Sequence, residues 1–414
     1  MHLTELRKKS LQDLSELAGG LGVEPLAGLR RQDLVFAILK AHGKGDILAD
    51  GTLEVLPDGF GFLRAPDQSY QPGADDVYVS PSQIRRFHLR TGDTIAGVVR
   101  PPKESERYFA LLRVDEVNGH APEGRASGLP FDDRTPVHPS RAIRLEHDRE
   151  NLATRVLDLL SPLGFGQRVL LHTPPRGGRT ALFQDLAHGI EDNHPDAALI
   201  LLLVDERPEE ITEMQREVEC EVVASTFDEA PTRHVQIAEI VLEKAKRKAE
   251  DGKDVVVLVD SLSKLARAYA AVVTPSGRLL PGGVEPAAIH RVKRFLAAGR
   301  NLAEGGSVTM IGAVLTDTGW RADEVLAEEL AGCANAEIHL DRRLAEQRLY
   351  PALDLGRTHT RRDDLLSSAE ARAAAAALRA EVASLSPEAA LAHLRARLAP
   401  HADNHALVAA LRGV

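Results

Sequence analysis

The chain has 414 residues, of which 43% are hydrophobic and 27% charged. At about 150 residues per domain this length predicts two or three domains rather than one core. The longest apolar runs, such as residues 197–204, are too short for a bilayer, which excludes a membrane-spanning protein. Two distant cysteines, Cys220 and Cys333, exclude a disulfide framework, and the N-terminal segment lacks a secretory signal's apolar stretch. We therefore expect a cytoplasmic protein.

The net charge of -10 describes the whole chain, whereas binding surfaces are local. Residues 84–107 hold six basic and three acidic side chains, so this stretch is net basic. Seven of the sixteen aromatic residues fall within residues 60–109. This region is therefore chemically distinct from the rest of the chain, and a nucleic-acid partner is not excluded.

The N-terminal part is predicted to hold a small helical unit, residues 1–45, followed by a β-barrel. Leucines at helical spacing favour the helices. From residue 46 to residue 117, short β segments are separated by turn residues. We expect strands at residues 52–56, 60–64, 77–79, 94–99 and 110–114. Five short strands in so short a region predict an OB-fold or cold-shock-like barrel.

The remainder is predicted to be an α/β domain, residues 151–365, after a connector at residues 118–150. Apolar strands alternate there with helical stretches, and their continuous apolar runs suit a parallel sheet covered on both faces. The expected strands are residues 168–172, 199–204, 221–225, 255–259, 308–314 and 337–340. Residues 366–414, rich in Ala, Leu and Arg, predict a helical tail. The fold is thus multidomain.

The segment Thr173–Thr180 follows one of these strands and opens a predicted helix, which is the context of a P-loop. A phosphate-binding turn needs glycine, free N–H groups at a helix N-terminus, a cation and a hydroxyl for Mg²⁺. Gly178 and Thr180 fit these needs. Thr173 stands where the pattern has its first glycine, and Arg179 where it has lysine. By itself the segment fits an ordinary glycine-bearing turn equally well.

Two carboxylates at the ends of other predicted strands change that balance. Asp260 ends a buried apolar strand, the position that orients Mg²⁺ beside a P-loop. Glu206 ends another strand, and at the carboxyl edge of a parallel sheet it is placed to polarise an attacking water. Each carboxylate alone fits a helix cap or a solvated strand end. Together the three segments predict a site for ATP and Mg²⁺.

Several separated blocks of sequence resemble the bacterial transcription termination factor Rho family, and they span nearly the whole chain. The blocks are residues 50–64, 76–86, 106–112, 205–210, 223–228 and 260–269. The resemblance implies a homohexameric ring with an OB-type RNA site and a RecA-like ATPase. It also implies a helicase that moves 5′ to 3′ along nascent, pyrimidine-rich single-stranded RNA, works with RNA polymerase and elongation factors, and promotes transcription termination.

Aromatic side chains in the barrel are the candidate RNA contacts. Phe60 and Phe62 stand two apart on one face of a predicted strand, and single-stranded nucleic acids stack on such platforms. Without the resemblance, both rings fit the barrel core about equally well. The resemblance implies further RNA contacts at Arg64, Tyr78, Glu106, Arg107, Tyr108 and, in a central loop, Arg278. We assign Tyr70, Phe87 and Phe109 to the core.

In the ATPase region the resemblance implies a role for each residue of the candidate site. Glu206 is the catalytic carboxylate, and Thr180 and Asp260 lie on the metal side. Arg361 is an arginine finger that reaches the nucleotide of a neighbouring subunit. In a monomer, Arg361 fits an ordinary surface arginine better. The nucleotide-contacting residues are Pro175, Arg176, Gly177, Gly178, Arg179, Thr180, Ala181 and Arg207.

At four positions where members of the family carry lysine, this chain has another residue: Arg176, Arg179, Arg278 and Ala331. With 11 lysines against 40 arginines, a general preference for arginine also explains the first three. Because a guanidinium is bulky and prefers bidentate partners, Arg179 is expected to impair hydrolysis more than binding. We expect Ala331 to lie in a second central loop, residues 328–335, where the loss of the family's lysine removes a contact with RNA phosphate. A basic helix at residues 289–301 is expected to line the channel.

Two alternatives to a helicase stay open. The changes at Arg179 and Ala331 favour an ATPase-weak or inactive Rho-like paralogue that binds RNA as a scaffold or modulates an active ring. A rotary-type ATPase subunit shares the RecA-like core and the arginine finger, but the aromatic barrel disfavours it. RNA-stimulated phosphate release tests the first alternative, and binding of single-stranded RNA by the N-terminal region tests the second.

Overall fold

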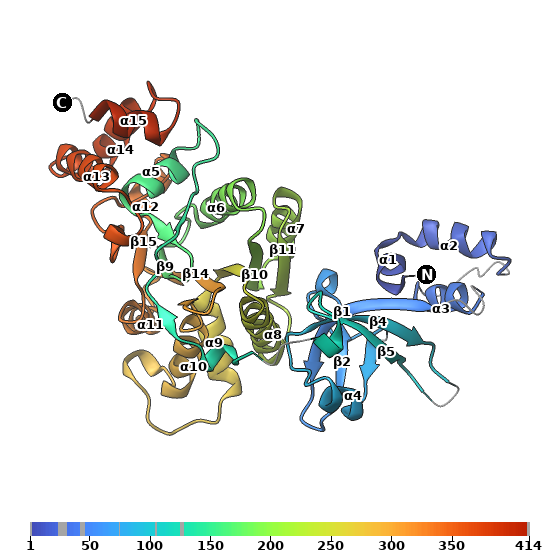
Figure 1. The fold of residues 1–414 in the computed structure, drawn as a ribbon. Coiled ribbons are helices and arrows are strands. Elements are labelled where there is room, and N and C mark those ends of the chain that lie inside the picture. Colours follow the sequence, from blue (N-terminus) through green and yellow to red (C-terminus); the bar gives the residue numbers. More distant parts are fainter. Residues whose placement is uncertain are drawn as a thin grey trace. The chain divides into compact units, whose positions relative to one another are not determined.

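The computed structural model describes residues 2–23, 31–41, 46–73, 75–103, 106–124 and 128–411. Packing divides the chain into two compact units, Met1–Gly128 and Leu129–Val414. Figure 1 labels helices and strands of both units where there is room, numbered in chain order. The five-part division expected from the sequence stays a prediction.

The first unit consists of helices and a closed five-stranded barrel, which is the predicted OB-like fold. Its strands pair in the order β1-β2-β3-β5-β4. The strands are β1 (Ile47–Val55), β2 (Gly61–Arg64), β3 (Val77–Val79), β4 (Thr94–Arg100) and β5 (Phe109–Val117). The helices are α1 (Leu3–Lys8), α2 (Leu11–Gly20), α3 (Arg31–Ala41) and α4 (Pro81–Arg86).

Alternation along the barrel strands sorts side chains into an inner and an outer set. Leu53, Leu63 and Ile95 are fully buried in the interior. Strands β4 and β5 approach closely at Gly97, where a Cβ atom would lie 2.1 Å from the carbonyl oxygen of Arg113. Glycine therefore permits the barrel to close at this point. Phe62, the neighbour of Leu63, belongs to the outer set.

A nine-stranded, mostly parallel sheet forms the centre of the second unit. Its main path runs β11-β10-β12-β14-β9-β15-β16. The six predicted strands are present as β9 (Arg168–Thr173), β10 (Ala198–Glu206), β11 (Glu221–Thr226), β12 (Asp254–Asp260), β14 (Ser307–Leu315) and β15 (Ala336–His339). The added short strands are β6 (Pro136–Val137), β13 (Arg300–Leu302) and β16 (His359–Thr360), and a separate pair is β7 (Ala142–Ile143) and β8 (Leu163–Gly164).

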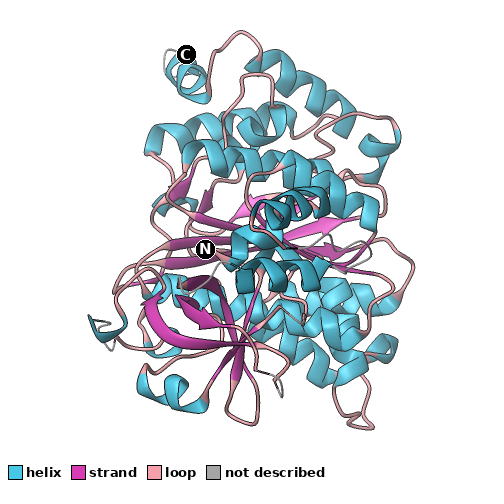
Figure 2. Cartoon of the chain, turned by 90° about the vertical axis from the view of Figure 1, so that its right-hand side faces the viewer, coloured by secondary structure: helices cyan, strands magenta, loops and turns pink. Residues whose placement is uncertain are grey.

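Helices cover both faces of this sheet, as Figure 2 shows. One face packs against α8 (Pro231–Glu250), α9 (Leu262–Val272) and α11 (Arg321–Ala331), and α10 (Pro286–Leu296) packs on α9 and α11. The other face shares its core with α5 (Leu152–Leu160), α6 (Arg179–Asn193), α7 (Pro208–Glu217) and the C-terminal helices. Because both faces are covered, the strands carry the continuous apolar runs that the sequence displays.

Two expectations about the second unit are wrong. The helix expected at residues 289–301 ends at Leu296, and Arg300 then pairs with Val308 of β14 as part of β13. The segment 328–335, expected as a loop, begins within α11, which ends at Ala331. Asn335 then accepts a hydrogen bond from the amide of Arg168 (2.8 Å), at the amino end of β9. Ala331 therefore lies toward the end of the sheet opposite the predicted P-loop.

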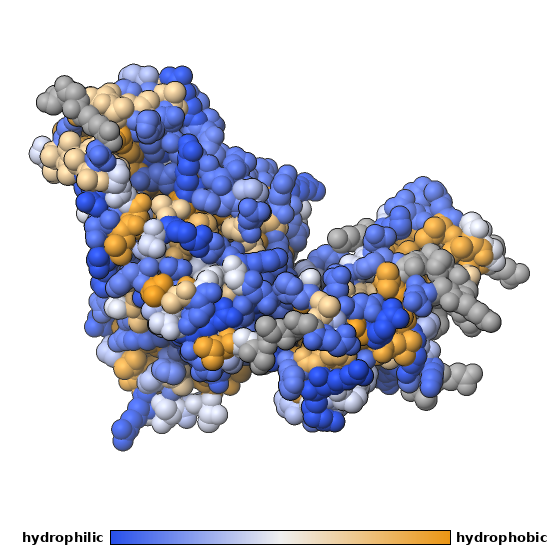
Figure 3. Space-filling view, in the orientation of Figure 1, coloured by the Kyte–Doolittle hydropathy of each residue, from blue (hydrophilic) through white to orange (hydrophobic). Residues whose placement is uncertain are grey.

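The C-terminal residues form the predicted helical tail. Its helices are α13 (Ala369–Val382), α14 (Pro387–Leu398) and α15 (Asn404–Leu411), preceded by the short α12 (Arg342–Glu346). Figure 3 shows hydrophilic side chains over most of the visible face, interrupted by small apolar patches. Across the described ranges, no helix combines the length and the apolar character needed to cross a membrane.

Candidate nucleotide and RNA sites

The loop between β9 and α6 has the backbone shape of an anion-binding turn. Gly178, the N-cap of α6, has a φ of 86°, and Arg176 has a φ of 61°. The amide of Gly177 donates to the carbonyl oxygen of Pro174 (3.0 Å), which closes the loop. The first amides of α6, from Arg179 onward, have no partner within the helix and lie at the positive end of its dipole. This geometry suits a phosphate group.

Charged side chains from three other elements meet beside the loop. Arg179 lies between two carboxylates: its Nε is 2.7 Å from Oδ2 of Asp260, and its Nη2 is 3.3 Å from Oε2 of Glu206. Asp260 ends β12 and Glu206 ends β10, so the parallel register brings both to the carboxyl edge of the sheet. Lys264 of α9 places its Nζ 2.7 Å from the same Glu206 oxygen. One network thus joins three predicted residues with Lys264, which sequence reasoning missed.

Asp260 has the electrostatic character of a cation-binding group. Burial raises the pKa of its carboxyl to about 6, although Arg179 acts in the opposite direction. Its Oδ1 atom has no hydrogen-bond partner among the described residues. The Arg179 Nε–Asp260 contact is an ion pair rather than a hydrogen bond. A buried carboxylate oxygen without a donor fits a cation or a water bound to one.

Two cavities border the loop. One, of about 660 Å³, is lined by residues 174–181 together with Glu210 and Tyr350. The other, of about 350 Å³, is lined by residues that include Thr180, Glu206 and Arg207. Together the two cavities bring the predicted nucleotide contacts into one region. They include Arg207, which stands exposed at the N-cap of α7.

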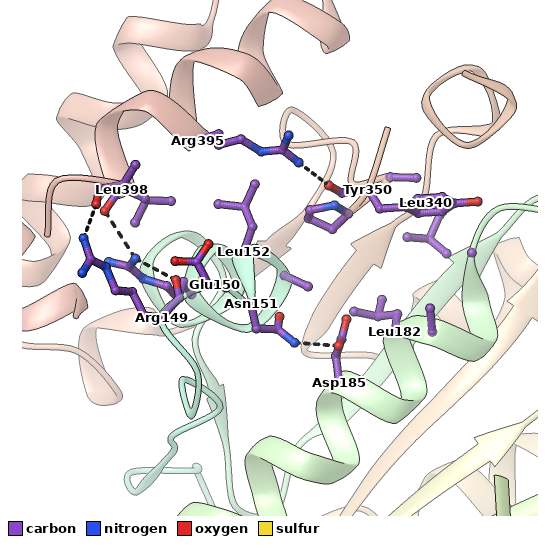
Figure 4. Close-up of a pocket in the computed structure, with 17 residues that line it drawn as sticks. Arg149, Glu150, Asn151, Leu152, Leu182, Asp185, Leu340, Tyr350, Arg395 and Leu398 are labelled. Atoms are coloured by element: carbon purple, nitrogen blue, oxygen red, sulfur yellow. Dashed lines mark hydrogen bonds between the residues drawn. The ribbon is translucent and has the colours of Figure 1, made fainter. Parts of the chain in front are cut away.

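A third cavity, of about 500 Å³, opens beside the start of α6 (Figure 4). Asn151 at the N-cap of α5 donates to Asp185 (2.6 Å), and Arg395 of α14 donates to the carbonyl oxygen of Tyr350 (3.0 Å). Tyr350 is 45% exposed, and its ring is so close to Gly178 that a Cβ atom on Gly178 would lie 2.8 Å from it. Tyr350 therefore lines both this cavity and the loop. Sequence reasoning missed Tyr350, because only packing brings it to the loop.

Two of the predicted arginines lie apart from the phosphate cavities. Arg361 is exposed just after β16, and its amide donates to the carbonyl oxygen of Asn335 (2.9 Å). Arg278 is exposed as well, and its amide donates to Oγ of Ser276 (3.2 Å). Neither lines the cavities of its own chain.

On the barrel, four aromatic rings form a continuous cluster, which we call the aromatic surface: Phe60, Phe62, Tyr78 and Tyr108. Phe62 lies at its centre, with ring centroids 5.8 Å from Phe60, 6.1 Å from Tyr78 and 4.8 Å from Tyr108. Phe62 is 8% exposed, yet it is not part of the interior cluster, whereas Tyr108 is 37% exposed. The rings therefore form an outer platform rather than the barrel core.

Arg64 is not positioned as a free cation for RNA. It is buried, and its guanidinium forms ion pairs with Asp76 and with Glu54 (2.7 Å). It also lies 5.0 Å from the centroid of the Phe62 ring. Arg64 therefore supports the aromatic surface from beside the Phe62 ring. As predicted, Tyr70 and Phe109 are buried, and Phe87 is partly buried against the core.

Next to the aromatic surface lies a cavity of about 580 Å³. It is lined by residues that include Tyr78, Glu106, Arg107 and Tyr108, so four predicted RNA contacts share one hollow. Arg100, which sequence reasoning counted only as part of a basic stretch, donates from Nη2 to Oε1 of Glu106 (2.8 Å). This hydrogen bond is the main cause that holds the pKa of Glu106 at about 2. Glu106 is thus a fixed anionic acceptor at the cavity wall.

A RecA-like P-loop unit and a barrel with an outer aromatic platform define a class, that of nucleotide-binding proteins with an attached OB-type domain. The family model of the Rho termination factor RNA-binding domain matches residues 49–123, and that of its N-terminal domain matches residues 5–46. The nucleotide-binding domain of the ATP synthase alpha/beta family matches residues 153–359.

Curated relatives extend the match over most of the chain. Transcription termination factor Rho of Haemophilus influenzae is 56% identical over 376 residues, which cover 89% of this chain and 90% of that protein. The Rho protein of Escherichia coli K12 is 55% identical over 375 residues, with the same coverage. The chain belongs to the transcription termination factor Rho family. The match over both units favours this family over the rotary-type alternative.

Solved structures of two secretion ATPases share the fold. A prototypical ATPase from a type III secretion system has a TM-score of 0.56 at 20% identity, covering 67% of this chain and 86% of that one. The assembled ATPase EscN of enteropathogenic E. coli has a TM-score of 0.56 at 22% identity, covering 76% and 79%. At these identities the likeness shows the fold alone.

Proposed function

We propose that the chain is an ATP-dependent RNA helicase and translocase that binds nascent single-stranded RNA as a homohexamer, moves 5′ to 3′ and promotes transcription termination. The observation that carries this proposal is that one chain holds two candidate binding sites. These are the charged network at the phosphate loop and the aromatic surface with its cavity. Membership of the Rho family supports it. RNA polymerase and elongation factors are the partners that this function requires.

At the nucleotide site, the loop amides and the α6 N-terminus bind phosphates, and Tyr350 offers a ring face to the base. Glu206 orients and polarises the attacking water, while Lys264 fixes the position of its carboxylate (2.7 Å). Thr180 and Asp260 would hold Mg²⁺, which when bound neutralises charge on the phosphates. Arg361 acts on the nucleotide of a neighbouring subunit, since it lines no phosphate cavity of its own chain.

Arg179 makes a weak ATPase the second candidate. Its guanidinium neutralises Asp260 and Glu206, the two carboxylates that hydrolysis needs, instead of pointing to an open phosphate position. ATP must therefore draw Arg179 away from both partners before the site is competent. If these ion pairs persist when nucleotide binds, ATP turnover is slow and the chain acts as an RNA-binding scaffold.

At the RNA site, bases stack on the aromatic surface, and each stacked base contributes about 1–3 kcal/mol. Glu106 accepts hydrogen bonds from a base edge, and Arg107 contacts the backbone. Arg278 is proposed to contact RNA in the central channel of the ring.

An RNA-dependent ATPase assay on the purified full chain tests the proposal. Phosphate release should rise when a pyrimidine-rich single-stranded RNA is added. The double variant Phe62→Ala/Tyr108→Ala serves as the control, because it should lose the RNA stimulation and keep nucleotide binding. Turnover at the no-enzyme background, with RNA and nucleotide both bound, would reject the helicase and leave the scaffold.

A further inference from the structure

Outside the nucleotide and RNA sites, three histidines and one glutamate gather at the edge of the large sheet. They come from three neighbouring strands: His172 from β9, Glu337 and His339 from β15, and His359 from β16. The register pairs His339 with His172 and Glu337 with His359. Because paired residues point to the same face, and because Glu337 and His339 are two apart, all four side chains share one face.

The spacing of the ligand atoms fits a small metal ion. The Nε2 atom of His172 is 3.0 Å from Oε2 of Glu337, and Nε2 of His339 is 3.6 Å from the same oxygen. Zinc–nitrogen and zinc–oxygen bonds of about 2.0–2.2 Å place tetrahedral ligand atoms roughly 3.3–3.5 Å apart. The ligand atoms of these three residues all lie within 4.8 Å of one another. The His172 and His339 rings are stacked with centroids 4.0 Å apart, so they need only splay slightly around an ion.

The surroundings supply what a metal ligand requires. The side chains of His172 and His339 are only 8% and 7% exposed, so both imidazoles are largely shielded from water. The buried Nδ1 of His339 has no hydrogen-bond partner among the described residues, and its Nε2 is 3.6 Å from Glu337, so either ring nitrogen is available to an ion. Glu337 offers the only carboxylate in the cluster. Arg357 lies near enough to lower both histidine pKa values, and its charge opposes a cation.

His359 connects the cluster to solvent and supplies a fourth ligand atom. Its side chain is 50% exposed, and its Nε2 lies 3.9 Å from Oε1 of Glu337. Its Nδ1 is 2.9 Å from the carbonyl oxygen of Arg357, a contact that favours the tautomer with a proton on Nδ1 and a lone pair on Nε2. Metal-binding histidines are commonly oriented by such a second contact.

We propose that His172, Glu337, His339 and His359 form a binding site for a divalent transition-metal ion of the zinc type. Imidazole and carboxylate donors suit Zn²⁺, Co²⁺ or Ni²⁺ rather than Mg²⁺. Such an ion would tie together the strand that leads into the phosphate loop and the strand that precedes Arg361. The site therefore offers a way for metal to restrain Arg361 without touching the nucleotide.

Titration of the tag-free, chelator-treated full chain with Zn²⁺, in competition with a chromophoric chelator and without nucleotide, tests the proposal. We expect one ion per chain, bound at micromolar concentration or tighter. Glu337→Gln should weaken binding at least tenfold, and exposed His359→Ala should weaken it measurably. His393→Ala is the matched control, because His393 also faces a carboxylate, that of Glu381 (2.7 Å), but belongs to no group of three ligands within the described residues.

Further measurements on the wild-type chain test the site without relying on variants that could fail to fold. Co²⁺ should give the intense visible absorption of a tetrahedral site with the wild-type chain, and His359→Ala should change that spectrum. Zn²⁺ should also raise the melting temperature of the wild-type chain, and a chelator should reverse the rise. No saturable binding, or binding unaffected by both Glu337→Gln and His359→Ala, would overturn the proposal.

Discussion

The two binding regions of this chain are built on opposite physical principles. The aromatic surface of the barrel is held by cross-strand packing, with Arg64 and its two carboxylates fixed beside Phe62. The candidate nucleotide site is held by charge, with Arg179 and Lys264 paired to Glu206 and Asp260.

This difference indicates how each region responds to its ligand. Stacking on the barrel needs little rearrangement, because the rings already stand on the outer face. Binding at the phosphate loop must exchange existing ion pairs for contacts with phosphate, so part of the interaction energy is spent on opening the network. We therefore expect the RNA site to be preorganised and the nucleotide site to be switchable.

The largest expected effect is the loss of turnover in Glu206→Gln. If this carboxylate polarises the attacking water, RNA-stimulated phosphate release should fall by about 10²–10⁴-fold, while nucleotide affinity changes little. The control is Glu209→Gln, an exposed glutamate in the first turn of α7. Turnover within tenfold of the wild-type rate would remove Glu206 from the catalytic role.

Phe62→Ala tests the preorganised side of the comparison. Loss of the central ring should weaken binding of pyrimidine-rich single-stranded RNA by about 1–3 kcal/mol, measured by fluorescence anisotropy at fixed salt. Phe87→Ala, in the same unit but outside the aromatic surface, is the matched control. Equal losses for the two variants would mean that Phe62 acts only through barrel stability.

Arg179→Lys tests the switchable side. A compact ammonium cannot bridge Asp260 and Glu206 as the guanidinium does, so the carboxylates are released and turnover should rise about tenfold, or about 1.4 kcal/mol. Arg216→Lys, at an exposed position in the last turn of α7, is the control and should change the rate less than twofold. A fall in turnover with Arg179→Lys would show that the arginine is the better residue in this site.

The smallest effect concerns a partly buried carboxylate of the second unit, that of Asp158, for which no ion pair like those of Asp260 is seen among the described residues. Asp158 accepts hydrogen bonds from the amides of Leu145 (2.9 Å) and Glu146 (2.8 Å), and burial raises its pKa to about 7. Since the folded state holds this proton more tightly than the unfolded state, stability is present at low pH and is lost as pH rises through 7.

Between pH 6 and pH 8 this loss should amount to about 1 kcal/mol for the single group. Urea unfolding of Asp158→Asn should therefore show less of this decline than unfolding of the wild-type chain. If both proteins lose the same stability over this range, Asp158 is not the group responsible.

Most of the fold could be predicted from the sequence, because strand periodicity and turn residues are local signals. All six predicted strands of the large sheet and all five of the barrel are present. The errors fall where long-range pairing ends an element: Arg300 joins β14 instead of extending α10, and Asn335 is held at the start of β9. No local pattern contains that information.

For the candidate sites, the motifs identified Glu206, Asp260 and the phosphate loop, because chemistry at strand ends has a sequence signature. Lys264 and Tyr350 were missed, since their relevance depends on the packing of α9 and of residue 350 against the loop. Arg64 was predicted to contact RNA, but its guanidinium is held in ion pairs with two carboxylates.

The sequence alone determined the order of strands and helices, the phosphate turn and the family, since each depends on neighbouring residues or short motifs. Only the tertiary structure decided that Arg179 lies between two carboxylates, that Phe62 faces outward, and that His172, Glu337 and His359 share one sheet face. The reason is physical: charge neutralisation and metal-ligand geometry depend on distances of a few ångströms between residues far apart in the chain, and sheet register sets those distances.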